Sequence, residues 1–220
     1  MVYSLTSKPT LGHEAAKETL DGDVSRIEVA DKTPDAGFDA NSARTYPANQ
    51  GRPILSEHVP TKVEWQESGP VPDVDMARGL LAVPERFREI VEQFEPGVHQ
   101  FLPVDYLDRR GAVLAKRYFF IACNRLDSVD RAHTTMILFK GARWLPAADL
   151  VRRKKLEEIP PGFDVNAKPK LVFSNAQVGG KHAWSDMFLP LYGPYLSDAL
   201  GAALEAAHFT GVSFQHYEAV

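Results

Sequence analysis

Residues 113–131 read VLAKRYFFIACNRLDSVDR, and we expect the rest of the fold to assemble on this stretch. Its first eleven residues are apolar or small except for Lys116 and Arg117, and aromatic and β-branched side chains are frequent among them. Such a run, when turn residues bound it, is typical of a strand that is buried on both faces. The sequence therefore predicts a buried strand over residues 113–123.

A turn and a second strand precede this run. The tetrapeptide DRRG ends at Gly111, which can take the positive φ angle that a short hairpin requires. Before the turn, Leu102, Val104 and Tyr106 alternate with other side chains at the strand period. We therefore expect a β-hairpin over residues 99–123 at the centre of the fold.

Two segments have the 3.6-residue apolar period of amphipathic helices. The first covers residues 84–94, PERFREIVEQF, and is followed by the Pro-Gly pair that ends at Gly97. The second covers about residues 195–208, where an alanine-rich stripe allows close packing on a sheet. The apolar positions are Phe87, Ile90, Val91 and Phe94 in the first segment, and Leu196, Ala199, Leu200, Ala203, Leu204 and Ala207 in the second.

These elements predict an α+β fold with an antiparallel or mixed sheet built from hairpins and two amphipathic helices packed on it. Residues 60–220 are expected to form this single domain. Residues 1–59 are poorly patterned and acidic, and we expect them to pack on the main body. The shorter predicted elements are strands at 25–30, 134–139, 142–145, 170–174 and 211–217, an edge strand near 63–65, a helix at 147–158 and a long ordered loop at 175–193.

The charge of the chain is unevenly distributed. Residues 1–70 hold 7 Lys/Arg and 11 Asp/Glu, whereas residues 71–220 hold 18 of each, so the first third carries the whole net charge of −4. The balanced remainder argues against non-specific binding of nucleic acid. The single cysteine fits a reducing compartment, and no apolar run is long enough for a membrane span. We therefore expect a cytoplasmic protein without nucleic-acid or membrane partners.

Motifs of known catalytic chemistry are incomplete. Residues 178–182, VGGKH, lack the first glycine and the Ser/Thr of a phosphate-binding loop. His182 and Asp186 supply two metal ligands at helical spacing, whereas a site needs at least three. Cys123 with His133 suggests a nucleophile and base, but the thiol ends an apolar strand and is most simply buried. We therefore predict no catalytic, cofactor-binding or metal-binding residues, and no enzyme activity.

A charged cluster follows the central strand. Asp127 and Asp130 lie beside Arg125 and Arg131, and we interpret them as a salt-bridge and turn-capping network that fixes the loop. The alternative is a small-ligand-binding protein or enzyme with a polar pocket near Arg125, Asp127, Asp130 and His133. A third interpretation is a structural or regulatory interaction module with constitutive partners.

Four blocks, in order along about residues 75–217, resemble a bacterial immunity-protein family that was long described only as a domain of unknown function. The family is associated with polymorphic and secreted toxin systems. Residues 1–70 match it only loosely. The blocks are PERFREIVEQFEPGVHQFLPV, RYFFIACNRLDSVDRAHTT, KLVFSNAQVGGKHAW and SDALGAALEAAHFTGVSFQHY.

The resemblance implies a non-enzymatic protein that binds and neutralises a cognate secreted or contact-delivered bacterial toxin, and it carries over no catalytic residue. We predict partner contacts in and beside the 175–193 loop, at His182, Trp184, Tyr192 and Tyr195, because aromatic side chains anchor interfaces. Trp184→Ala is then expected to weaken toxin binding without unfolding, unless Trp184 belongs to the core. The acidic first third of the chain would steer a basic toxin.

Overall fold

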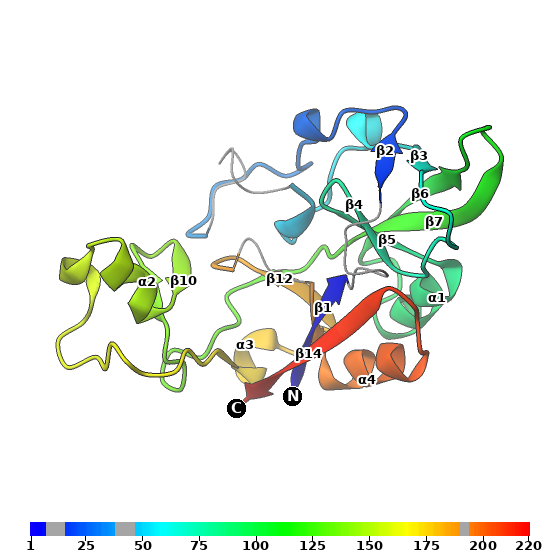
Figure 1. The fold of residues 1–220 in the computed structure, drawn as a ribbon. Helices are drawn as coiled ribbons and strands as arrows, with labels where there is room; N and C mark the ends of the chain where they lie inside the picture. The colour runs from blue at the N-terminus through cyan, green and yellow to red at the C-terminus, as the bar shows by residue number, and fades with distance from the viewer. Residues whose placement is uncertain (8–15, 38–46, 190–193) are drawn as a thin grey trace.

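The computed structural model describes residues 1–7, 16–37, 47–189 and 194–220. Within these ranges the chain forms two six-stranded sheets, one two-stranded sheet and four α-helices (Figure 1). Most strand pairs are antiparallel, and three are parallel: β3–β6, β11–β14 and β8–β12. The predicted α+β class with mixed sheets is confirmed.

The first sheet contains the predicted central hairpin. Gly111 has a φ of 83°, and the carboxylate of Asp108 accepts hydrogen bonds from the backbone N–H groups of Arg110 and Ala112, each at 2.8 Å. The hairpin is thus closed by the expected turn. The strand order is β2 (Lys17–Thr19), β3 (Lys62–Trp65), β6 (Gln100–Leu107), β7 (Val113–Ile121), β5 (Leu80–Val83) and β4 (Asp75–Ala77), so β3 is internal and not an edge strand.

The second sheet is built from both ends of the chain. Its strand β1, which the sequence analysis did not predict, pairs on one side with β14 and on the other with β13. The N-terminal segment therefore contributes β1 to this sheet and β2 to the first one; the assignment of residues 60–220 as a single domain stays a prediction. The strand order is β11 (Val172–Phe173), β14 (Val212–Ala219), β1 (Val2–Ser7), β13 (Tyr195–Ser197), β12 (Ala183–Asp186) and β8 (Arg125–Leu126).

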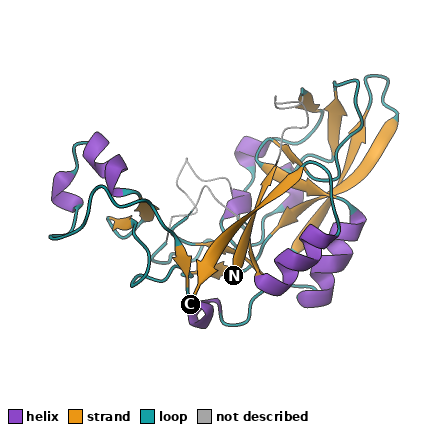
Figure 2. Ribbon diagram, turned by 60° about the horizontal axis from the view of Figure 1, so that its bottom comes forward, coloured by secondary structure: helices purple, strands orange, loops and turns teal. Residues whose placement is uncertain are grey.

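Two helices, α1 (Glu85–Phe94) and α4 (Asp198–Ala206), pack side by side and join the sheets (Figure 2). Both predicted helices exist, but α4 begins three residues later than expected because residues 195–197 form β13. Ser197 caps α4 by accepting a hydrogen bond from the N–H of Leu200. The shared core cluster holds Phe87 and Val91 from α1, Leu200 and Leu204 from α4, Tyr3 from β1 and Phe120 from β7.

A smaller lobe lies at the end of the molecule away from α1 and α4 (Figures 1 and 2). The predicted second hairpin is confirmed as β9 (Ile137–Phe139) and β10 (Arg143–Leu145). The helix that follows is shorter than predicted: α2 (Ala147–Arg152) ends before the 3₁₀ turn η4 (Leu156–Glu158). A small apolar cluster that includes Leu145 and Leu150 holds the lobe together.

Two further predictions need correction. The 175–193 segment is not a continuous loop, since it contains α3 (Asn175–Val178) as well as β12. The strand expected at residues 25–30 is replaced by the 3₁₀ turn η1 (Val24–Arg26) and a single bridge between Val29 and Ile54. The other 3₁₀ turns of this part are η2 (Pro47–Asn49) and η3 (Ser56–His58). In the described ranges, no helix has the length and apolarity to cross a bilayer.

The buried carboxylate of Glu95, just after α1, connects the two sheets. It bonds the Nε2 atom of His99 at 2.9 Å, the amide of Asn124 at 3.0 Å and the backbone N–H of Ala183 in β12 at 2.8 Å. The Nδ1 atom of His99 accepts a hydrogen bond from the N–H of Cys123, so Nε2 carries the proton and donates to Glu95. One side chain thus joins α1, the start of β6, the end of β7 and β12.

The surroundings of Glu95 also set its ionisation. Burial alone would raise the pKa of Glu95, but the hydrogen bonds from His99, Ala183 and Asn124 outweigh it and lower the pKa to about 2. The folded-state pKa lies below the ordinary value of 4.5. The ionised carboxylate therefore stabilises the fold above about pH 4.5, and this contribution is lost as the pH falls toward 2.

Glu95→Gln is expected to lower the free energy of unfolding by about 1.5–3 kcal/mol at neutral pH, because it replaces charge-assisted hydrogen bonds with weaker ones and brings a second donor into a buried site. The variant should also lose less stability than the wild type between neutral pH and about pH 3. Urea denaturation at both pH values measures these effects. Glu89→Gln, on the exposed side of α1, is the matched control. An equal acid loss in wild type and Glu95→Gln would contradict the role of this carboxylate.

Candidate partner-binding surface

Two of the residues predicted to contact a partner lie in the core. Trp184 in β12 and Tyr195 in β13 are both 0% exposed. The indole N–H of Trp184 donates to Ser128 Oγ at 2.9 Å, and its ring meets Phe173 edge-on. These aromatic side chains hold the second sheet together, so their burial argues against direct contact with a partner.

The other two predicted contact residues are placed differently. His182 is half-buried, its Nδ1 atom lies 2.8 Å from Ser197 Oγ, and its ring packs on Phe94 with a centroid distance of 5.0 Å. Tyr192 lies outside the described residues. Among the three predicted contact residues that the structure describes, His182 is the one whose partial exposure is compatible with contact in this conformation.

Asp186, considered above as a metal ligand with His182, has a structural role instead. Its buried carboxylate accepts hydrogen bonds from the N–H and Oγ of Ser128, each at 2.7 Å, and from the N–H of Phe188 at 2.8 Å. Burial raises the pKa of this group. Across the described parts of the chain, no three His, Cys, Asp or Glu side chains are grouped as metal ligands.

The charged cluster after the central strand forms ion pairs, as its primary interpretation predicted. Asp127 pairs with Arg131 at 2.7 Å, and Asp130 pairs with His133 at 2.8 Å while capping the turn. Arg125 donates two hydrogen bonds to the carboxylate of Asp35, of 2.5 and 2.8 Å. Of the four residues of the alternative pocket, only Asp130 and His133 contact each other, whereas Asp127 pairs with Arg131 and Arg125 with Asp35.

Asp35 is a residue that the sequence analysis missed. Its carboxylate also accepts from Arg52 at 2.8 Å, and the hydrogen bonds from Arg125, followed by that from Arg52, hold the pKa of Asp35 far below its usual range. Because the partners are 17 and 90 residues away along the chain, no local sequence motif predicts these ion pairs. The network ties the N-terminal segment to β8.

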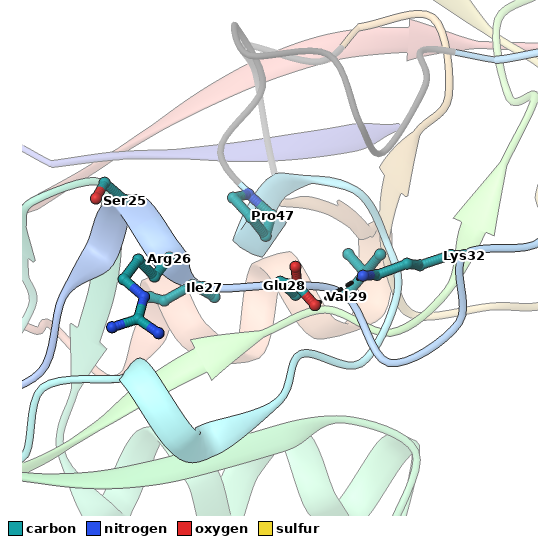
Figure 3. A pocket seen from close by; sticks show the side chains of 7 residues that line it. All are labelled: Ser25, Arg26, Ile27, Glu28, Val29, Lys32 and Pro47. Atoms are coloured by element: carbon teal, nitrogen blue, oxygen red, sulfur yellow. Dashed lines mark hydrogen bonds and ion pairs between the residues drawn. The ribbon is translucent and has the colours of Figure 1, made fainter.

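A concave surface of the described structure lies on this N-terminal segment. Two adjoining hollows of about 170 and 430 Å³ share the lining residues Ser25, Arg26 and Glu28, and we call the pair the η1 groove. Figure 3 shows the smaller hollow, where Glu28 pairs with Lys32 at 2.7 Å. The remaining lining residues are Ile27, Val29, Lys32 and Pro47 in the smaller hollow, and Leu55, Glu57 and His58 in the larger.

Backbone hydrogen bonds between two chain segments, residues 28–30 and 53–55, hold the groove in shape. The N–H of Ala30 donates to the carbonyl of Pro53 at 2.7 Å, and the N–H of Leu55 donates to the carbonyl of Glu28 at 2.8 Å. The side-chain amide of Gln100 in β6 bonds both backbone groups of Ile54, at 2.8 and 3.1 Å. The floor of the groove is thereby fastened to the central hairpin.

The alternation of side chains gives the groove a polar rim over an apolar floor. Ile27 and Val29 are buried in the core, while Arg26 and Glu28, which alternate with them along the chain, are exposed. Leu55, at the edge of the groove, is 46% exposed. An apolar contact surrounded by carboxylate and basic side chains suits protein recognition, and the groove lining holds no arrangement typical of catalysis.

A sequence model of the immunity protein family Imm11 matches residues 10–219. The chain belongs to this immunity protein family. The match confirms the resemblance and extends it to the N-terminal segment, so the η1 groove lies within the family domain. No curated protein matches the chain.

Trp184→Ala is expected to lower the free energy of unfolding by about 3–5 kcal/mol, because it empties a fully buried aromatic site. This expectation replaces the earlier one of weakened binding with an intact fold. Trp184→Phe keeps most of the ring but loses the hydrogen bond to Ser128, so a smaller loss is expected. Thermal and urea denaturation measure both variants. Normal stability of the alanine variant would show that the indole is not a core element.

Proposed function

We propose that this chain is a bacterial immunity protein that binds a cognate toxin of a polymorphic toxin system and blocks it in the cytoplasm. The observation that carries the proposal is the family match over residues 10–219. The proposed action is stoichiometric binding and not chemical conversion of the toxin.

The surroundings of the one cysteine support a non-enzymatic role. Burial raises the pKa of Cys123 to about 11, and its thiol donates to the carbonyl of Ile121 at 3.3 Å. A thiol of this pKa is protonated at neutral pH and is a poor nucleophile. The nearby imidazole of His99 is occupied on both nitrogens by Cys123 N–H and Glu95. This group of residues therefore supports the fold.

We propose the η1 groove as a toxin-contact surface. Its exposed carboxylates, Glu28 and Glu57, suit lysine or arginine side chains of a toxin, and Leu55 supplies apolar area between them. The net charge of −4 in residues 1–70 would accelerate the approach of a basic partner at low salt. The segment pairing described above means that little ordering is required on binding.

Glu28→Lys/Glu57→Lys is expected to weaken toxin binding at least tenfold, about 1.4 kcal/mol, because it places like charges against the toxin. The toxin is taken as the product of the adjacent reading frame, and the readouts are its affinity and growth rescue on co-expression. Glu89→Lys/Glu205→Lys, with the same change of charge on exposed positions of α1 and α4, is the control. Equal rescue by both double variants would exclude the groove as a contact surface.

A further inference from the structure

The lobe of residues 136–170 has a charge opposite to that of the rest of the chain. It holds 8 Lys/Arg and 4 Asp/Glu, a net charge of +4. The remaining residues hold 17 Lys/Arg and 25 Asp/Glu, a net charge of −8. The cationic lobe also lies at one end of the molecule, away from α1 and α4 (Figure 1). The protein therefore presents a positive end to its surroundings.

The positive charge gathers where α2 ends. Residues 151–156, VRRKKL, are all exposed, with Val151 42% and Leu156 62% exposed at the two ends of the run. We call these six residues the cationic knuckle. Leu150 points the other way and is fully buried in the small core of the lobe. The knuckle thus displays four basic side chains between two exposed apolar ones.

The backbone of the knuckle is held in a defined shape. The N–H of Lys155 donates to the carbonyl of Leu150 at 2.9 Å, and the N–H of Lys154 donates to that of Val151 at 3.0 Å. These two bonds form a Schellman motif, whose left-handed position usually holds glycine. Lys154 occupies that position with a φ of 57°. A charged side chain therefore stands where backbone conformation alone favours glycine.

The four basic side chains of the knuckle differ in their ion pairs. Arg152 lies 3.0 Å from Asp149 and Lys155 lies 3.8 Å from Glu157, both as exposed pairs. Arg153 and Lys154 form no ion pair with any residue that the structure describes. Their charges are available to an external partner.

The connection between lobe and body is ordered at its entry and exit. Thr135 accepts from the N–H of Lys170 at 2.8 Å and donates its hydroxyl to the carbonyl of Lys168 at 2.8 Å. Trp144 of β10 is buried against the body, and its backbone N–H donates to the carbonyl of Phe188 at 3.1 Å. The knuckle is thus presented on a fixed support, which lowers the entropic cost of binding.

We propose that the cationic knuckle docks on an acidic, partly apolar surface of the toxin. The inference rests on the proposed function and specifies the chemistry of its partner. Four basic side chains complement carboxylates, while Val151 and Leu156 offer apolar contact area. The knuckle has no aromatic side chain for stacking on nucleic-acid bases, and the six-residue α2 is too short to bury an amphipathic face in a membrane.

The test uses the full chain and the product of the adjacent reading frame as toxin. Arg153→Glu/Lys154→Glu is expected to weaken binding by about 10- to 100-fold and to reduce its salt dependence. Arg110→Glu/Lys116→Glu, on the exposed part of the β6–β7 hairpin, makes the same change of charge and should bind like the wild type. Leu156→Ser, which keeps all four charges, should weaken binding severalfold. Thermal denaturation of each variant verifies the fold.

Several results would overturn the inference. If the wild type binds the toxin and rescues growth, and Arg153→Glu/Lys154→Glu binds with unchanged affinity, the knuckle is excluded as a toxin contact. The proposed function is then unaffected. An equal loss in the hairpin control assigns the effect to net charge. Binding of the wild type to duplex DNA and to vesicles that contain phosphatidylserine is measured as well. If the knuckle variant alone loses such binding and keeps its toxin affinity, the knuckle is assigned to those ligands. A wild type that neither binds nor rescues overturns the proposed function itself.

Discussion

The carboxylate of Glu95 sets how the two sheets of this protein meet. It lies where α1 ends and the chain enters β6, and it bonds groups from β12 in the other sheet and from the segment after β7. A buried charge is tolerated only when hydrogen bonds surround it, and loss of one partner leaves the others unsatisfied in a medium of low dielectric constant. These hydrogen bonds therefore restrict the relative position of the two sheets more tightly than apolar packing alone would.

Long periodic segments were predicted from the sequence because their contacts are local. The central hairpin and α1 depend on side chains at strand or helix spacing within one segment. The strand β1 was missed because its partners, β13 and β14, lie near the other end of the chain. All four residues of β12 are buried, so polar and apolar side chains do not alternate between two environments there. Without that alternation, the sequence does not distinguish a core position of Trp184 from a position at an interface.

The functional surfaces were predictable in part. The acidic character of the N-terminal segment is visible in its composition. The η1 groove, in contrast, depends on an isolated β-bridge between Val29 and Ile54 that no sequence motif predicts. The basic run at the end of α2 resembles an ordinary solvated helix end until the structure shows Leu156 exposed beside it. An acidic N-terminal segment and a cationic knuckle on one molecule would fix the orientation of a partner, because reversed docking brings like charges together.

Inhibition of the toxin by the purified chain tests the central claim most directly. The toxin from the adjacent reading frame is assayed for its own activity while the immunity protein is titrated in. We predict that toxin activity falls linearly and reaches zero at one equivalent, with no covalent change in either protein. Full toxin activity at a large excess of the chain would contradict neutralisation by binding, and loss of activity at a small fraction of one equivalent would show catalysis instead.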